Sequence, residues 1–432
     1  MRDWLSGLAV YREKPIVVIF VLGFASGLPL ALTSATLTYW LAEQKVDIAV
    51  IGFFAWVGIA YGWKFVWAPV IDRLPLPLLT SLLGRRRGWL LLVQVLLILA
   101  ILLLGAADPA QDIRTTAALA VLVAFLSASQ DIVIDAYRVE ILDERQQAAG
   151  AAAVTIGYRI AMFVSGAGAL LLAEYYDWFT AYAVMAALLV VGSLVALWYG
   201  EPPGSKAVMA DTRRDVVGWL RQAVVDPFVE FFARNGVGTA VLILAFIMLY
   251  KMGDALLGAV TSPLYVELGF QKPEVAGIVK TYGLVATLVG VFLGGALVRS
   301  LGMLRGLWIC GIVQMLSNLI YIAQVHAGHD TRMLALTITV ENLTGGMGTA
   351  AFVGYLSSLC NVTYTATQYA LLSSFMAQAR TVLSGFSGMI QQHVGWIEFF
   401  ILTTLAAVPA LLLLLVMQRR FGAVPDTRPL PA

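Results

Sequence analysis

Two carboxylates, Asp131 and Asp135, stand four residues apart within Ser127–Leu142, at the end of an apolar run that begins at Thr115. Residues four apart lie on one face of a helix, so both side chains project the same way. A charged carboxylate in hydrocarbon costs roughly 3 kcal/mol on insertion scales unless it faces protein or water. This face is therefore expected to look inward. Such acids either carry protons or form structural ion pairs, and Arg138 is close enough in sequence to hold Asp135.

The deeper acid, Asp131, is the predicted proton carrier. Its neighbours Ile132 to Ile134 are apolar, and desolvation disfavours a charged carboxylate. Asp254 and Glu341 are the alternative proton sites. Asp135, beside Arg138, is expected to hold a gate.

Four further charges fall near the middle of apolar runs when positions are counted at about 1.5 Å per residue. They are Arg159, Lys251, Glu341 and Arg380. The cations suit carboxylates and Glu341 suits an amine. The alternative is that Lys251 pairs with Asp254 and Arg380 with Glu341 as structural bridges. Uncharged residues are predicted to complete a solute-binding surface: Gly27, Tyr61, Gln130, Tyr158, Tyr250, Asn342 and Gln378.

The first apolar run breaks at Ser26-Gly27-Leu28-Pro29. A proline inside a helix frees a backbone carbonyl, and a glycine permits close approach of another backbone. A kink that serves packing alone is the alternative interpretation.

The composition identifies the class of protein that carries these residues. Of the 432 residues, 60% are hydrophobic and 12% charged, and the mean hydropathy is +0.84. This composition is typical of a polytopic membrane protein. The net charge of +2 gives no reason to expect a nucleic-acid partner, and Cys310 and Cys360 predict neither a disulfide framework nor a metal cluster. No cofactor is expected.

Twelve apolar runs are long enough to cross a bilayer. They fall near Pro15–Trp40, Val46–Ile71, Gly88–Ala106, Thr115–Ile134, Gly150–Leu172, Trp178–Tyr199, Gly238–Val260, Val275–Val298, Gly306–Ala323, Met333–Leu359, Ala366–Ile390 and Phe399–Met417. The predicted organisation is a first six-span half at 1–200, a cytoplasmic linker with an amphipathic helix at 201–236, a second six-span half at 237–418 and a cytoplasmic tail at 419–432. Two parallel six-helix halves are the build of the major facilitator superfamily, an all-α membrane fold.

Positive charge predicts the orientation. Most of the 28 lysines and arginines fall on one side of the spans if both termini are cytoplasmic. A basic cluster after the second span suits a cytoplasmic gate, or serves only as a topology signal. The predicted gating residues are Asp72, Arg73, Arg85, Arg86 and Arg87, together with Asp135 and Arg138.

The position of charge also predicts which helices line a cavity. The third, sixth, ninth and twelfth spans have no Asp, Glu, Lys or Arg in their cores, whereas the others do or are broken. Intramembrane charges face the interior of a bundle. Every third helix is therefore expected to be peripheral.

Several stretches resemble the AmpG-type muropeptide permeases. They are Phe24–Leu30, Gly84–Trp89, Ser127–Asp135, Tyr250–Asp254, Glu341–Gly348 and Ala366–Leu372. The resemblance covers nearly the whole chain. It implies an inner-membrane importer of 1,6-anhydro-muropeptides, driven by proton symport and serving peptidoglycan recycling. It also implies a glycopeptide substrate, protons and the lipid bilayer as partners, and a monomer. Better-known members carry two further C-terminal spans.

Other functions fit this sequence less well. Permeases of the wider family carry siderophores, acetyl-CoA or drugs, so a proton-coupled transporter of another solute is the alternative. A membrane-embedded enzyme such as a lipid glycosyltransferase is not expected. The chain lacks a large outer loop and a paired acid motif at the membrane interface, and its three histidines cluster outside.

Overall fold

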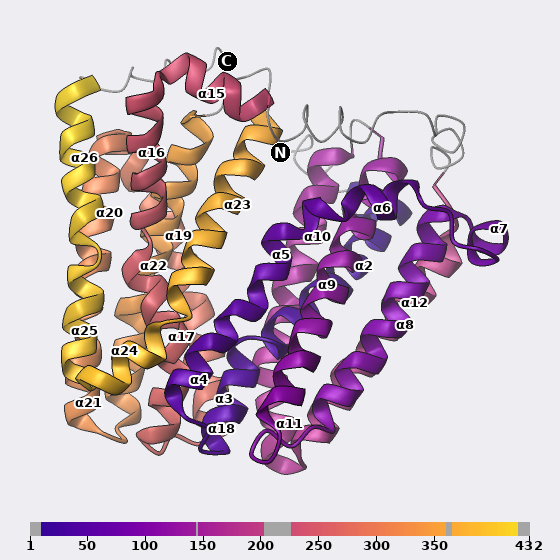
Figure 1. The fold of residues 1–432 in the computed structure, drawn as a ribbon, viewed down its shortest axis with the longest axis horizontal. Helices are drawn as coiled ribbons and strands as arrows, with labels where there is room; N and C mark the ends of the chain where they lie inside the picture. The colour runs from indigo at the N-terminus through magenta and orange to yellow at the C-terminus, as the bar shows by residue number, and fades with distance from the viewer. Residues whose placement is uncertain (1–9, 144–145, 203–225, 360–364, 422–432) are drawn as a thin grey trace. The chain divides into compact units, whose positions relative to one another are not determined.

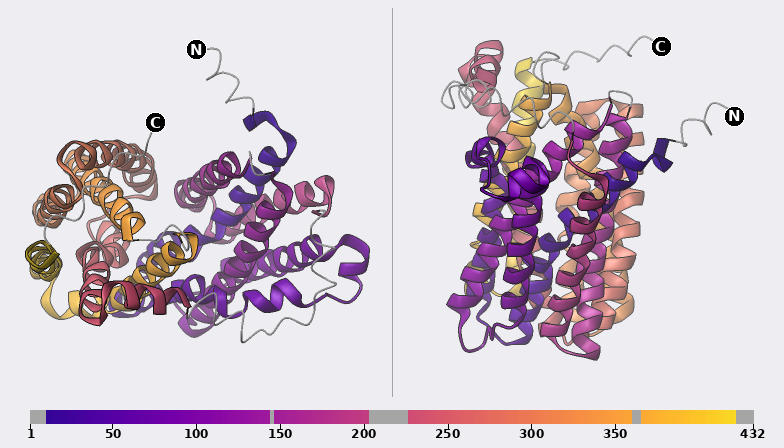
Figure 2. Two further views of the ribbon diagram at one scale, coloured as in Figure 1. Left: turned by 90° about the horizontal axis from the view of Figure 1, so that it is seen from above. Right: turned by 90° about the vertical axis from the view of Figure 1, so that its right-hand side faces the viewer.

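The computed structural model describes residues 10–143, 146–202, 226–359 and 365–421. Every regular element in these ranges is a helix. The chain forms two compact units, the first made of Met1–Val46 and Val57–Arg214, the second of Asp47–Trp56 and Asp215–Ala432. Within each unit the long helices run side by side (Figures 1 and 2).

The first six predicted spans and their connections are formed by helices up to Tyr199. In chain order these are η1 (Val10–Arg12), α2 (Lys14–Leu32), α3 (Ala35–Glu43), α4 (Ile48–Phe53), η2 (Phe54–Gly58), α5 (Ile59–Trp63), η3 (Lys64–Val66), α6 (Ala68–Arg73), α7 (Leu79–Leu83), α8 (Arg85–Gly105), α9 (Ile113–Ile141), α10 (Gln147–Phe163), η4 (Val164–Gly168), α11 (Ala169–Tyr175) and α12 (Trp178–Tyr199).

The last six predicted spans follow α15 (Asp226–Asn235), which occupies the end of the predicted linker. They are formed by α16 (Val237–Leu249), α17 (Met252–Glu267), α18 (Lys272–Glu274), η6 (Val275–Tyr282), α19 (Gly283–Leu301), α20 (Met303–Ser317), α21 (Ile320–Ala327), α22 (Thr331–Leu359), α23 (Thr365–Ser384), α24 (Ser387–Val394), α25 (Trp396–Leu405) and α26 (Val408–Phe421).

Aspartates begin four of these helices. Asp47, Asp112, Asp177 and Asp330 each accept a hydrogen bond from a backbone N–H of the turn that follows. Such a side chain satisfies a donor that the first turn of a helix leaves free. At least one of the four backbone N–H groups that are free at the start of each helix is thereby satisfied.

Nine helical segments in the described residues are long and apolar enough to cross a membrane. The second, tenth and eleventh predicted spans are not among them. The second is not one helix: it divides into α4, α5 and α6, joined by the 3-10 helices η2 and η3. The tenth and eleventh, α22 and α23, are helical but carry polar residues such as Glu341 and Arg380.

Large apolar side chains also lie on the outside of both units. Leu103 of α8, Leu194 of α12 and Phe292 of α19 are 56%, 59% and 79% exposed. An exterior of this kind suits hydrocarbon rather than water. The polar groups lie elsewhere, on the faces described next.

Candidate functional site

Pro29 leaves one backbone carbonyl of α2 without its helical donor. Because proline has no N–H, it cannot donate to the carbonyl of Ala25, four residues earlier. Gln130 of α9 supplies the donor, with its Nε2 at 2.9 Å from the Ala25 oxygen. The carbonyl freed at the break predicted at residues 26–29 therefore has its hydrogen-bond donor on α9, the helix that carries the two aspartates. Gln130, predicted to bind substrate, is fully buried and holds α2 against α9 instead.

Ser26 lies beside this contact and donates its hydroxyl proton to Asp131. The next residue, Gly27, packs against the backbone of Tyr158 on α10, and a side chain at Gly27 would collide with it. Gly27 was predicted to bind substrate. It is buried, and it lets α2 approach α10 closely, which positions Ser26 over Asp131.

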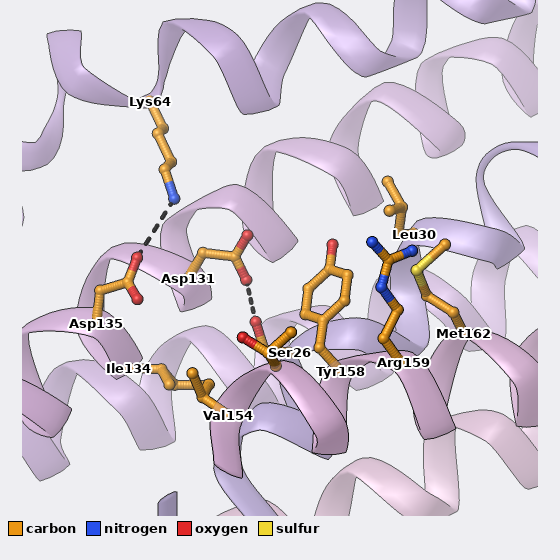
Figure 3. Close-up of a pocket in the computed structure, with 11 residues that line it drawn as sticks. Ser26, Leu30, Lys64, Asp131, Ile134, Asp135, Val154, Tyr158, Arg159 and Met162 are labelled. Carbon is orange, nitrogen blue, oxygen red and sulfur yellow. Dashed lines mark hydrogen bonds and ion pairs between the residues drawn. The ribbon is translucent and has the colours of Figure 1, made fainter. Parts of the chain in front are cut away.

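A pocket of about 450 Å³ opens in the first unit between α2, η3, α9 and α10. Its lining comprises Ser26, Leu30, Lys64, Asp131, Ile134, Asp135, Val154, Thr155, Tyr158, Arg159 and Met162. In Figure 3 the carboxylates gather at one end of this group, and Arg159 and Met162 lie beyond Tyr158. None of these lining residues comes from α8 or α12. That agrees, in this unit, with the prediction that the third and sixth spans are peripheral.

Arg159 is exposed and lines this pocket. The ion pairs among the described residues of the first unit involve Lys64, Arg85, Arg86 and Arg87, not Arg159. Its guanidinium is therefore a cation without an acidic partner in the part of the unit that the structure describes. Tyr158 lies beside it, and Tyr61 of α5 is partly buried close to Asp131.

Asp135 pairs with a residue that the sequence did not assign to it. Lys64 Nζ lies 3.6 Å from Asp135 Oδ2, and Figure 3 shows this lysine reaching in from η3. The sequence-based interpretation placed Asp135 with Arg138, because the two are three apart on α9. The ion pair that the structure gives Asp135 spans two helices, so proximity along the chain was a poor guide here.

The second unit has its own polar cluster, centred on Lys251. Lys251 Nζ lies 3.3 Å from Asp254 Oδ2 and donates to Gly345 O and Thr349 Oγ1 at 3.3 and 3.2 Å. Gln314 of α20 donates to the same Asp254 oxygen. The structural bridge left open for Lys251 and Asp254 is therefore present. Gln314 also brings the ninth span, predicted to be peripheral, into contact with the charged cluster.

Glu341 accepts a hydrogen bond from Asn342 Nδ2 at 2.8 Å, and Asn342 Oδ1 accepts one from Thr287 at 2.8 Å. No ion pair joins Glu341 to Arg380 among the described residues. Arg380 is exposed and Gln378 is partly buried on α23. The bridge considered for Arg380 and Glu341 is thus not found in this part of the chain.

Tyr250 lies in an aromatic core rather than at a cavity. It is 6% exposed, its ring stacks on Phe352 at a centroid distance of 5.0 Å, and its hydroxyl donates to Leu307 O at 3.0 Å. The prediction that Tyr250 binds substrate is not supported by this burial. Its side chain packs α16 against α20 and α22.

The basic first turn of α8, Arg85 to Arg87, is held by two acids. Arg86 binds Glu140 of α9 through Nη2 at 2.6 Å, and Arg85 Nη2 lies 3.6 Å from the same oxygen. Glu201 accepts from the backbone N–H of Arg86 and Arg87 at 2.9 and 3.0 Å. A carboxylate at this position also interacts favourably with the helix dipole. The turn therefore joins α8, α9 and the segment after α12; the side chains of Asp72 and Arg73 lie outside the described residues.

Comparisons with known proteins agree with this arrangement. The Major Facilitator Superfamily model matches residues 19–322. An anhydromuropeptide permease of Escherichia coli (strain K12) is 42% identical over 414 residues, which cover 95% of this chain and 81% of the relative. The chain belongs to the AmpG-type permeases of this superfamily. A putative transporter AmpG 4 of Rickettsia felis is 37% identical over 413 residues, which cover 95% of this chain and 98% of the relative.

Solved structures show the same fold at low identity. The nucleoside transporter NupG superposes with a TM-score of 0.67 at 12% identity, covering 93% of this chain and 99% of the NupG chain. The POT family transporter PepTSo gives a TM-score of 0.67 at 12% identity, covering 94% of this chain and 99% of that one. These likenesses establish the transporter fold of the permease and nothing about its substrate.

Several contacts of the permease site were missed from sequence. From sequence, Ser26 is named only as part of the break in the first apolar run, and Lys64, Gln314, Glu140 and Glu201 have no predicted role. A polar residue inside an apolar run was the available signal for Ser26, Lys64 and Gln314. Within the described residues, no group of three or more His, Cys, Asp or Glu could hold a metal ion.

Proposed function

We propose that this permease imports 1,6-anhydro-muropeptides across the bacterial cytoplasmic membrane by proton symport, and so supplies peptidoglycan recycling. It acts as a monomer with both termini in the cytoplasm. The observation that carries the proposal is the pocket of the first unit, which holds Asp131 and Arg159 in a chain 42% identical to an anhydromuropeptide permease.

Arg159 is the first candidate to meet a carboxylate of the peptide part. It has no acidic partner among the described residues, so it can bind an anion without first breaking an ion pair. Tyr158 and Tyr61 offer an aromatic face and a hydroxyl to a sugar ring. In the second unit, Arg380, Asn342 and Gln378 are further candidate contacts. Lys251 can join them only if its pair with Asp254 opens.

Asp131 is the proposed proton-coupling carboxylate. It lies in the lining of the pocket, so water and substrate can reach it, and Ser26 holds it in place. A proton moving down the membrane potential supplies about 2.3 kcal/mol per 100 mV, and 1.4 kcal/mol is a tenfold ratio. One proton per cycle therefore drives roughly forty-fold accumulation per 100 mV. Glu341 and Asp254 are the alternative proton sites.

The basic turn at residues 84–89 is the proposed cytoplasmic gate. Its arginines bind Glu140 and Glu201, which come from two other segments of the first unit. The Arg86 and Glu140 side chains are only 7% and 17% exposed, so opening this gate requires a helix movement that brings water to both charges. Asp72, Arg73 and Arg138 belong to the same proposal.

The test is uptake of labelled anhydro-muropeptide by proteoliposomes at several imposed pH gradients. Asp131→Asn is close in shape to the original side chain but cannot titrate. We expect it to abolish gradient-driven accumulation and to retain counterflow exchange, and we expect Glu341→Gln to keep both. If Asp131→Asn still concentrates the substrate, Asp131 does not couple protons and Glu341 becomes the candidate. If the unaltered protein takes up only another solute, the substrate assignment is wrong.

A further inference from the structure

Lys64 and the two aspartates of α9 line one pocket. Asp131 and Asp135 are one helical turn apart, and Lys64 approaches them from η3, with Nζ 3.6 Å from Asp135 Oδ2. Lys64 is also within electrostatic reach of Asp131. Figure 3 shows the lysine extending towards the part of the pocket where both carboxylates lie. One cation, Lys64, therefore lies near two carboxylates.

The existing pair is loose. Its 3.6 Å separation exceeds the roughly 2.7–2.9 Å of a charge-assisted hydrogen bond. The Lys64 and Asp135 side chains are 35% and 58% exposed, so water competes for both. Lysine has a flexible four-carbon stem, and it starts here from a 3-10 helix between two short α-helices. Little free energy opposes a change of partner.

We propose that Lys64 is a counter-ion shared by Asp135 and Asp131. While Asp131 carries a proton it is neutral, and Lys64 stays with Asp135, so the three groups have no net charge. When Asp131 releases its proton to water, the set carries one negative charge and Lys64 is drawn towards Asp131. The reverse happens when Asp131 takes up a proton. Lys64 is thus a positioning residue for proton coupling, and this inference rests on the proposed role of Asp131.

Other groups around Asp131 do not replace this role. Ser26 of α2 gives a neutral hydroxyl, and Tyr61 of α5 and Tyr158 of α10 are phenols. Arg159 is the other cation of the pocket, and Figure 3 places it beyond Tyr158. The charges where α8 packs on α9 are Arg85 and Arg86, which Glu140 binds more than two turns from Asp131.

The experiment compares the pH midpoint of proton-driven uptake in Lys64→Gln, Asp135→Asn and the double variant. Lys64→Gln removes the cation that lies beside the two acids, while Arg159 stays beyond Tyr158, so Asp131 holds its proton to higher pH. Asp135→Asn leaves Lys64 to Asp131 alone, so the midpoint moves to lower pH. Each shift should be about half to one pH unit, as expected for one charge in a hydrated site. The double variant restores the original charge balance and should return close to the original midpoint. Lys64→Arg should keep it.

Asp143→Asn, an exposed acid just beyond α9, is the matched control and should leave the midpoint unchanged. A second measurement needs no transport. The protons bound by the purified protein are titrated against pH, the protons bound by Asp131→Asn are subtracted, and the difference gives the midpoint of Asp131. Shifts of one sign in both single variants, or no shift in either, would overturn the shared counter-ion. If instead Asp131→Asn still accumulates substrate or removes no titrating group, the proposed function of Asp131 has failed as well. The two failures are therefore distinguishable.

Discussion

The contact between Gln130 and the carbonyl freed by Pro29 can be tested by a double-mutant cycle. Gln130→Ala removes the donor, and Ala25 then keeps a buried carbonyl that Pro29 cannot serve. Pro29→Ala restores a backbone N–H at the position that would close the helical bond. In the Pro29→Ala background the carbonyl of Ala25 therefore no longer requires the side chain of Gln130 as its donor. The effect of Gln130→Ala should therefore depend on the residue at position 29.

The size of the effect follows from the burial of the contact. An unsatisfied buried acceptor costs about 1–3 kcal/mol in soluble proteins, and interhelical hydrogen bonds in membranes average about 0.6 kcal/mol with a maximum near 1.7. Gln130 is fully buried and its bond is 2.9 Å long. We therefore expect Gln130→Ala to lower the free energy of unfolding by about 2 kcal/mol, of which about 1 kcal/mol disappears in the Pro29→Ala background. The rest of the loss comes from the cavity that the missing side chain leaves.

The assay is reversible unfolding in mixed detergent micelles, followed by circular dichroism for the four proteins of the cycle. Gln94→Ala is the matched control, because Gln94 is equally buried in the same unit but binds Ser193 rather than the proline break. Its effect should be the same with proline or alanine at position 29. The reasoning is refuted if Gln130→Ala costs as much in the Pro29→Ala background as in the original chain.

Four more expectations follow from the contacts. Gly157→Ala should lower the free energy of unfolding by about 1–3 kcal/mol, because a Cβ there meets the backbone of α2, whereas Gly258→Ala, with open space around it, should be neutral or stabilising in thermal unfolding. Glu201→Ala should destabilise by about 2 kcal/mol in the same measurement, since two backbone N–H groups of α8 lose their acceptor. Hydrogen bonds from Thr115 hold the pKa of Asp112 below its ordinary 3.8. Asp112→Ala should therefore destabilise at neutral pH, and the difference from the original chain should shrink as the pH falls below 3.8. Lys251→Met should destabilise by about 3 kcal/mol because it strands Asp254, and Lys251→Met with Asp254→Asn should recover most of that loss in the micelle assay.

The fold was predictable because its signals are local. Apolar runs of membrane length are visible along the chain, and nine helical segments in the described residues are long and apolar enough to cross a membrane. The absence of charge in the third and sixth spans also identified helices that stay out of the pocket, since charge must avoid lipid. The second span differs most from a single helix because η2 and η3 interrupt it, and no single residue marks these 3-10 segments.

The partners of the site residues were much less predictable. Lys251 and Asp254 are three apart on adjoining turns, so their pairing was open to inference from sequence. Glu201 binds the backbone of Arg86 across 115 positions, and nothing local connects them. The same holds for Lys64 and Asp135, whose approach depends on how η3 packs against α9. Such contacts are set by tertiary packing, which residue spacing does not encode.

The two polar clusters differ in how their charges are compensated. Lys251 and Asp254 neutralise each other, and neighbouring hydrogen bonds hold both in place. In the first unit Asp131 receives a neutral hydroxyl, and Arg159 has no acid among the described residues. Uncompensated charge is costly in a membrane protein unless a proton, a substrate or water meets it. The first unit therefore holds groups that are free to exchange partners during a cycle, and so do Glu341 and Arg380 in the second unit, which form no ion pair with each other among the described residues. The second holds a pair whose first role is structural, so deleting one charge in each unit should separate effects on transport from effects on folding.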